Sequence, residues 1–504
     1  MPASAAAQAI DARGQYVCPG LLDPHAHEEI LMLANPTLEK FVRQGVTTLI
    51  NGNCGHSVTP YRAKTVLEYW WREALISRKR SQMDVDWEGV DGYAKTVART
   101  GATINSVVLL GYGGIRWGAM RGGFDRPPTG AEWKEIEGLV ESGLEQGAVG
   151  MSTGLAYRPC YYATTGELIR VSRILAKHDK VYASHLRAGA NGALEAIEIG
   201  QKAGCRLQLS HFRGGSKAAL DLVTGANRRG LDVAADVIPQ STSHRRASNR
   251  MLEALMVFYP GAFDYSLDQL RGLVRDSRTR AEILKSIAFF NNDKAQVVIV
   301  RALTPKHEAG VGRSVAQLAK AAGKDPGDYY IELILDEDNP VVFAFDGDRR
   351  EARSTRRGRG SADSADRLPD GYWTTHPRFG PGADSIPVDM DDPYGWYEHQ
   401  RRGAFAGYFR QARANGVSIE AAVQRATQLP AGQFRVKDRG VLAAGKVADV
   451  MVFDPEAFRY PTPAESDPND PFTVASGVLH VVVNGVPVLV DAKLTGQKPG
   501  KVIL

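Results

Sequence analysis

The sequence predicts an α/β protein built on a (β/α)8 barrel, and three observations lead to this prediction. Short apolar segments alternate with segments of helical spacing along much of the 504-residue chain. Each such unit takes roughly 30–50 residues, as parallel strands joined by helices require. Polar residues capable of chemistry fall where the apolar segments end, and a barrel gathers the carboxyl ends of its strands at one mouth.

The expected elements follow in order along the chain. Each predicted strand is a short apolar run that ends at glycine or at polar residues, and each predicted helix repeats apolar residues at a spacing of three or four. The predicted strands are residues 16–22, 45–50, 104–110, 147–152, 181–184, 206–210, 231–237 and 341–345. The predicted helices between them are residues 35–44, 61–78, 131–146, 168–178 and 190–203.

Changes of composition along the chain predict its domain organisation. Residues 1–18 are expected to be a remnant of a β-domain, residues 19–430 the catalytic barrel, and residues 431–504 a C-terminal β-domain, forming a small β-sandwich. Within the barrel, residues 261–340 change to charged helical patterns. We interpret that stretch as an inserted, lid-like helical subdomain.

The overall composition excludes several classes of protein. The 62 Lys and Arg against 57 Asp and Glu leave a net charge of +5, too small for this length to indicate nucleic-acid or membrane partners. Apolar runs fall short of the roughly 20 residues that span a bilayer. The first residues lack the pattern of a secretory signal, and four cysteines are too few for a disulfide framework. We therefore expect a cytoplasmic protein, with a homo-oligomer left open.

A set of possible metal ligands stands at the predicted strand ends. In PGLLDPHAH, two histidines are spaced i and i+2, so they would project from the same face of a strand. The other members follow later strands, and one of them is a cysteine between flexible glycines. The candidate ligands are His25, His27, Cys54, His185, His211 and Asp346.

The chemistry of this set favours zinc, as one ion or two. Imidazole, thiolate and carboxylate together are the ligands that Zn²⁺ prefers in proteins. Zinc lowers the pKa of bound water to about 7 and so supplies a nucleophile at neutral pH. Asp346 is expected to take the proton from that water and to return it to the leaving nitrogen, acting as general base and then general acid.

Several motifs resemble the metal-dependent amidohydrolase superfamily and, within it, the N-acyl-D-amino-acid deacylase (D-aminoacylase) family. PGLLDPHAH is similar to the superfamily signature, and GVTTLINGNCGHSVTP and GAVGMSTGLAYRPCYYATTGEL are similar to family segments. ASHLR, LSHF, a DG pair, HPR and the closing GVLAAGKVADVMVFDP follow in the family's order. The resemblance covers nearly the whole chain and implies a barrel of the metal-dependent hydrolase type.

The resemblance also implies roles for individual residues. His25, His27 and Asp346 match the more labile metal position, while His185 and His211 match the tighter one. Cys54 matches the shared ligand, with its thiolate in the place of a carboxylated lysine. In addition, the resemblance implies three substrate contacts: Arg378 with the substrate carboxylate, Tyr157 with the scissile carbonyl, and Arg213 at the position of a family lysine.

Some positions depart from the family pattern. Ile238-Pro239-Gln240 stands where the family has Tyr-Pro-Tyr, and Phe345 stands where it has Ser. Family members also begin with additional strands, so we expect either a truncated start or an incomplete β-domain.

We predict a zinc-dependent enzyme that cleaves a non-peptide C–N bond in a small amide, by deacylating an N-acyl-(D-)amino acid. Two alternatives remain open. The same metal chemistry could act on a cyclic amide, a carbamate or a specialised metabolite. The chain could also be a non-catalytic barrel.

Overall fold

The centre of the molecule is an eight-stranded parallel sheet, in the order β12-β8-β7-β6-β5-β4-β3-β2. The computed structural model describes residues 9–504 except 63–64, 68–83, 86, 122, 124, 157–158, 188, 213–215, 240–245, 249–271, 273, 287–295, 303–304, 336–340, 347–367, 370, 386–402 and 462–472. The strands are β2 (Leu21–Asp23), β3 (Val46–Asn51), β4 (Asn105–Gly111), β5 (Gly150–Gly154), β6 (Val181–His185), β7 (Arg206–Leu209), β8 (Val233–Val237) and β12 (Phe379–Pro381).

The sheet curls into a nearly closed barrel, which confirms the predicted fold class. The segments that follow its first and last strands lie side by side: Ala26 forms a parallel bridge with Ser385, and the Asp384 N–H donates to the His25 carbonyl at 2.8 Å. Strands such as β3 and β4 are buried along their whole length, which explains their nearly continuous apolar sequence.

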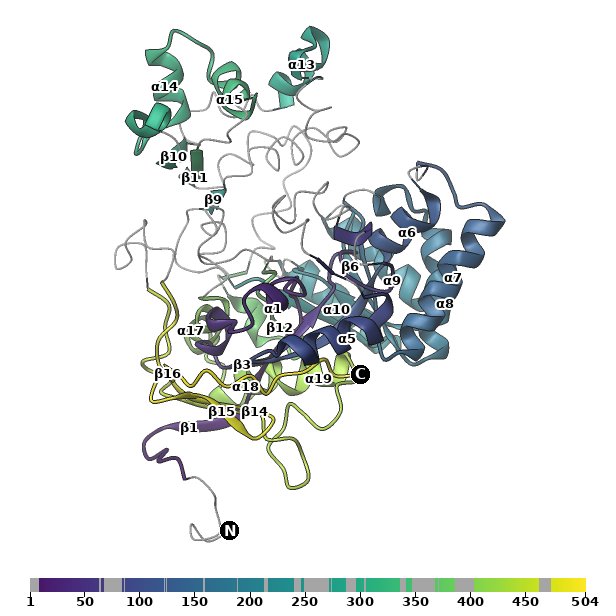
Figure 1. Cartoon of the computed structure of the whole chain (residues 1–504), viewed down its shortest axis with the longest axis vertical. Helices are drawn as coiled ribbons and strands as arrows, with labels where there is room; N and C mark the ends of the chain where they lie inside the picture. The colour runs from purple at the N-terminus through teal and green to yellow at the C-terminus, as the bar shows by residue number, and fades with distance from the viewer. Residues whose placement is uncertain are drawn as a thin grey trace.

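Helices follow the strands and pack around them (Figure 1). Their starts are set by local chemistry: α7 begins at Thr129, which forms a capping box with Glu132, and Thr164 caps α8. The helices are α1 (Leu31–Ala34), α2 (Glu39–Val42), α5 (Gly89–Thr100), α6 (Tyr112–Met120), α7 (Gly130–Glu145), η2 (Cys160–Tyr162), α8 (Thr165–Lys177), α9 (Gly189–Ala203), α10 (Lys217–Arg228), η7 (Tyr372–Thr375), α17 (Ala404–Ala414), α18 (Ile419–Ala426) and α19 (Gln428–Gln433).

A separate antiparallel sheet has the order β1-β13-β14-β15-β16. Its strands are β1 (Tyr16–Pro19), β13 (Val450–Phe453), β14 (Val478–Val483), β15 (Val486–Val490) and β16 (Lys493–Leu494). The expected single strand at 16–22 is therefore wrong, because it divides at Gly20 between this sheet and the barrel. The Gly20 N–H donates to the Asp449 carbonyl, and a Cβ at Gly20 would lie 2.3 Å from Thr47.

A third sheet, in the order β10-β11-β9, joins β9 (Arg246–Ser248), β10 (Gln296–Ala302) and β11 (Val341–Asp346). The strand expected at 341–345 exists as β11, but its placement in the barrel is wrong because β11 pairs with β10 and β9. The neighbouring helices, in the upper part of Figure 1, are α13 (Ser277–Ser286), η5 (Pro305–Gly310), α14 (Val315–Ala321) and α15 (Pro326–Leu335). The lid role of this region and the domain boundaries stay predictions.

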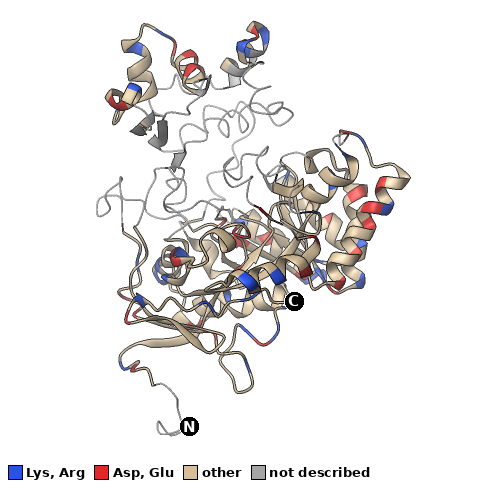
Figure 2. Ribbon diagram, in the orientation of Figure 1, with Lys and Arg blue, Asp and Glu red and all other residues tan. Residues whose placement is uncertain are grey.

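The surface agrees with the balanced composition of the chain. Acidic and basic residues are interspersed on the outer helices α7 and α8 (Figure 2). Within the described part of the chain, no helix has the length and apolarity needed to cross a membrane.

Candidate metal centre

A cluster of metal-binding side chains lies at the carboxyl ends of the barrel strands. One ligand atom from each of four residues lies within 4.8 Å of the others, and these residues are His25, Cys54, His211 and Asp384. They follow β2, β3, β7 and β12 respectively, so residues far apart in sequence meet at one mouth of the barrel.

The sulfur of Cys54 is at the middle of the cluster. It lies 3.2 Å from Nε2 of His25, 3.5 Å from Nε2 of His211 and 3.7 Å from Nδ1 of His185. The ring of His185 is also next to that of His211, with 4.3 Å between their centroids. His185, the last residue of β6, therefore lies next to both Cys54 and His211.

Asp384 supplies the carboxylate of the cluster. Its Oδ1 lies 3.3 Å from Nε2 of His25 and 3.5 Å from Nε2 of His27. The two histidines of the HAH motif therefore point to the same carboxylate oxygen, as their i, i+2 spacing predicts. All five predicted histidine and cysteine ligands come together here, and their role as ligands stays a prediction.

Three cluster residues have unusual backbone geometry. The φ angles of Cys54, His211 and Asp384 are 55°, 34° and 50°. Residues other than glycine rarely adopt this left-handed region. The tight turn around Cys54 also depends on Gly52, because a Cβ there would lie 2.3 Å from the Leu109 carbonyl oxygen. Such conformations persist at functional sites when the surrounding fold holds them.

The charged groups of the cluster shift the pKa values of Cys54 and His25. Burial alone would raise the pKa of the Cys54 thiol, but the His25 and His211 rings lower that pKa well below its usual range. Burial likewise opposes the charged form of His25, yet the carboxylate of Asp236 and the thiolate of Cys54 raise its pKa well above the usual value. These contacts favour the thiolate of Cys54, the form that binds metals.

The donor set fits zinc. Imidazole nitrogens, a thiolate and a carboxylate are the three ligand types of zinc sites in proteins, and the cluster offers all three within one sphere. Nδ1 of His27 is buried without a hydrogen-bond partner among the described residues.

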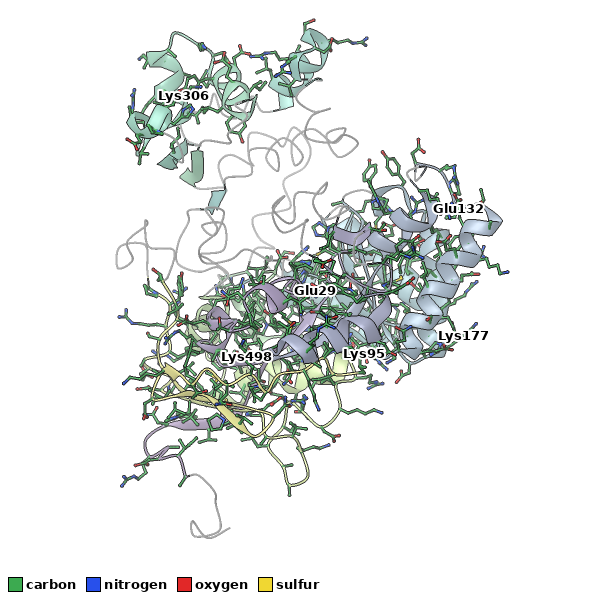
Figure 3. All side chains as sticks on the ribbon, in the orientation of Figure 1. Glu29, Lys95, Glu132, Lys177, Lys306 and Lys498 are labelled. Atoms are coloured by element: carbon green, nitrogen blue, oxygen red, sulfur yellow. The ribbon has the colours of Figure 1, made fainter. Side chains whose placement is uncertain are left out.

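Glu29, labelled in Figure 3, is fully buried. Burial raises its pKa to about 8, so Glu29 does not add a full negative charge beside the cluster.

The carboxylate that the structure places in the cluster is not the one that the sequence predicts. Asp346 ends β11, in the sheet with β10 and β9, whereas Asp384 follows the barrel strand β12 and lies in the cluster. The sequence signal for Asp384 is weak because β12 has only three residues, Phe-Gly-Pro. The expected place of Asp346 on a barrel strand is therefore wrong, and its assignment as ligand and proton carrier stays a prediction.

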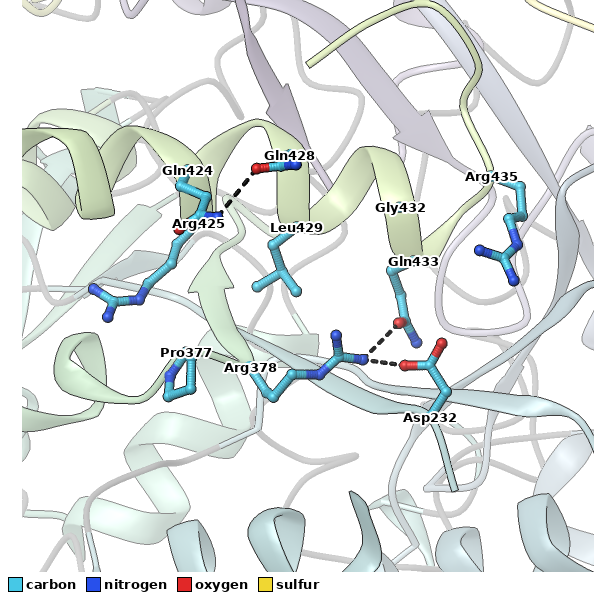
Figure 4. Close-up of a pocket in the computed structure, with 10 residues that line it drawn as sticks. All are labelled: Asp232, Pro377, Arg378, Gln424, Arg425, Gln428, Leu429, Gly432, Gln433 and Arg435. Atoms are coloured by element: carbon cyan, nitrogen blue, oxygen red, sulfur yellow. Dashed lines mark hydrogen bonds and ion pairs between the residues drawn. The ribbon is translucent and has the colours of Figure 1, made fainter. Parts of the chain in front are cut away.

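Arg378 lies at the other end of the barrel. It precedes β12 and contacts Asp232, which precedes β8, so both residues are at the amino ends of parallel strands. Its Nε donates to the Val233 carbonyl at 2.9 Å. Its Nη2 donates to Oε1 of Gln433 at 3.1 Å and also contacts Asp232 (Figure 4). These contacts are all with the protein, and the contact with a substrate carboxylate that the resemblance implies stays a prediction.

The contacts of Arg378 lead to a testable expectation. Replacement by Ala should lower the free energy of unfolding by about 1–3 kcal/mol, because Asp232, Gln433 and a strand carbonyl each lose a donor. Denaturant unfolding measures this effect. The KM for a carboxylate-bearing substrate should stay near the wild-type value, and a large rise in KM at unchanged stability would contradict the placement.

Two further predicted residues, Tyr157 and Arg213, lie outside the described residues, and their roles stay predictions. Two aspartates that the sequence does not single out, Asp23 and Asp236, form hydrogen bonds with residues of the cluster. Asp23 Oδ1 accepts the His25 N–H at 3.0 Å and the Ala383 N–H at 3.1 Å. Asp236 Oδ2 lies 2.9 Å from Nδ1 of His25.

Comparisons with known proteins agree with this architecture. Residues 382–489 match the model of the amidohydrolase family. Two relatives from Alcaligenes xylosoxydans xylosoxydans are each 28% identical to the chain. They are an N-acyl-D-glutamate deacylase, matched over 100% of this chain and 89% of the relative, and a D-aminoacylase, matched over 99% and 90%.

A solved structure of a deacylase has a similar fold. N-acyl-D-glutamate deacylase from Bordetella bronchiseptica, complexed with zinc and a phosphonate inhibitor, superposes with a TM-score of 0.68 at 25% identity, over 98% of this chain and 90% of that one. The C-terminal part of the chain thus matches the amidohydrolase family, and the full-length relatives that the chain resembles are N-acyl-D-amino-acid deacylases at about 28% identity.

Proposed function

We propose that this chain is a zinc-dependent hydrolase that deacylates an N-acyl-D-amino acid or a related small amide. The observation that supports this proposal most is the convergence of His25, Cys54, His211 and Asp384 at the barrel mouth. The full-length relatives that deacylate N-acyl-D-amino acids supply the substrate class. The zinc in the Bordetella bronchiseptica enzyme supports the choice of metal.

Zinc would be held by the four residues of the cluster, with His27 and His185 available beside them, as one ion or two. When bound, zinc supplies a Lewis acid that polarises a carbonyl oxygen and lowers the pKa of water. The chain itself fixes where the donors point: Cys54 faces three imidazoles, and its burial keeps bulk water from the thiolate.

Asp384 is the residue that we propose moves the proton. It is the carboxylate of the cluster, and 16% of its side chain is exposed, so water can reach it. Its Oδ1 would accept the proton of the attacking water and then give it to the leaving nitrogen. This role passes from Asp346 to Asp384. The carbonyl contact of Tyr157 and the substrate contact of Arg213 remain part of the proposal.

One sequence feature favours a second candidate substrate class. Ile238 and Pro239 follow β8 where the resembling family has Tyr-Pro-Tyr, which removes an aromatic hydroxyl after that strand. The same site could therefore act on a cyclic amide or a carbamate.

A substrate panel with defined zinc content tests the function. The chelator-treated protein is reloaded with zinc and assayed on N-acetyl-D- and L-amino acids, including glutamate and aspartate, and on cyclic amides and carbamates. We expect hydrolysis of an N-acetyl-D-amino acid that disappears with the metal. Turnover of only a cyclic amide or a carbamate would support the second candidate, and a zinc-bound protein that hydrolyses none of these would overturn both.

A further inference from the structure

One buried carboxylate connects two cluster residues from different strands. Asp236, on β8, has no exposed surface. Its Oδ2 lies 2.9 Å from Nδ1 of His25 and accepts the backbone N–H of His211 at 2.7 Å. Its Oδ1 accepts from Nε2 of Gln208 at 2.8 Å. Three donors therefore surround the two oxygens of a single side chain.

We propose that Asp236 is a positioning residue that holds His25 and His211 together as a pair of metal ligands. This inference rests on the proposed zinc site. The contact at Nδ1 of His25 fixes the proton on that nitrogen and leaves Nε2 as the ligand atom. Nε2 is the nitrogen that lies 3.2 Å from the Cys54 sulfur and 3.3 Å from Oδ1 of Asp384.

The second bond of Oδ2 acts on the backbone. His211 has a φ of 34°, an unfavourable angle for a residue with a side chain. The bond from its N–H to Asp236 helps to hold this conformation, which directs the imidazole to Cys54 at 3.5 Å. The same oxygen thus orients one ligand through its ring and another through its main chain.

The packing leaves Asp236 no room to move away from His25. A Cβ at Gly382 would lie 2.9 Å from Oδ2 of Asp236 and 3.0 Å from Cβ of His25. Gly382 also donates its N–H to the Val237 carbonyl at 3.0 Å, which holds its backbone against β8. The Asp236 carboxylate is therefore held in place by hydrogen bonds to Gln208 and the two histidines and by packing against the Gly382 backbone.

A purely structural role for Asp236 is the competing explanation, and Asp23 offers a matched comparison. Both residues are fully buried aspartates at the same mouth, and both accept hydrogen bonds from residues of the cluster or its neighbours. Among the described residues, Asp23 accepts hydrogen bonds only from main-chain N–H groups, whereas Asp236 also contacts the ring of His25. A ring-orienting role predicts different zinc affinities for Asp236→Asn and Asp23→Asn.

The test measures zinc affinity directly, by competition with a chromophoric chelator on the full-length protein. Asp236→Asn keeps the side-chain size, and rotation of the Gln208 amide can restore a bond to the new NH₂ group. We expect this variant to bind Zn²⁺ about 10–100-fold more weakly. Asp23→Asn should bind zinc within a few-fold of wild type. Melting temperatures of the zinc-free proteins report any general loss of structure.

The outcomes separate this inference from the proposed function. A wild-type protein that binds no zinc would overturn the proposed function. A wild type that binds zinc, with equal affinity in Asp236→Asn, would overturn the inference alone, as would equal losses in both variants. If Asp236→Asn does not fold, Gln208→Leu carries the test. This substitution removes the hydrogen bond to Oδ1 of Asp236 and changes no metal ligand. We expect a smaller but measurable loss of zinc affinity. Unchanged zinc affinity would again count against the inference.

Discussion

Replacement of Asp384 by Asn should lower kcat by roughly 10²–10⁴-fold, the usual contribution of a positioned acid or base. An amide of the same size can still occupy the space beside His25 and His27 but cannot accept a proton from water. Steady-state kinetics on the best substrate of the panel measures the effect. Zinc content, measured on the same samples, separates lost proton transfer from lost metal.

Asp346→Asn is the matched control for this prediction. Both substitutions remove one carboxylate. Asp346 ends β11, whereas Asp384 follows β12, which belongs to a different sheet. The Asp346 variant should keep kcat close to wild type because its strand does not belong to the barrel. A large loss for Asp346→Asn, with little effect at position 384, would contradict the assignment made from the structure.

Replacement of Cys54 by Ser should weaken zinc binding by at least about 100-fold, which exceeds the usual effect of changing a residue that only supports a ligand. The thiolate lies within 3.7 Å of three imidazole nitrogens, and a serine hydroxyl stays protonated there at neutral pH. Chelator competition measures the loss of zinc affinity. Turnover without added zinc should fall as zinc affinity falls.

Cys160→Ser is the control for that change. Cys160 is also a buried cysteine, but burial raises its thiol pKa to about 12, so it remains a thiol. Its substitution can cost stability through the buried hydroxyl, yet zinc affinity should not change. Retained zinc affinity in Cys54→Ser, or an equal loss in Cys160→Ser, would show that the cluster does not bind zinc through Cys54.

The sequence predicted the parts of the site that follow ordinary strands. The β3 and β7 segments are apolar and rich in residues that favour strands, so Cys54 and His211 could be placed at their carboxyl ends. The HAH spacing placed His25 and His27 on one face without knowledge of the fold. These predictions depend only on local patterns, and the structure brings the side chains together.

Other parts could not be predicted because the local signal is absent or misleading. Phe-Gly-Pro in β12 has the composition of a turn, whereas β11 has that of a buried strand, so the sequence favours Asp346 over Asp384 as the carboxylate ligand. Nothing local marks Asp236 as a partner of His25, since its contacts are with residues that follow β2 and β7 in the chain. Such contacts arise only when the barrel closes.

The division of the chain at Gly20 has a consequence for anyone who wishes to trim or recombine this protein. β1 pairs with β13, from Tyr16 opposite Phe453 to Pro19 opposite Val450, and β2 begins two residues after β1 ends. The C-terminal sheet is thus tied, through a linker of one residue, to the strand that presents the HAH motif. A fragment that ends before β13 would leave β1 without its hydrogen-bonding neighbour, so crossover points for chimaeras belong outside the stretch that β1 and β13 share.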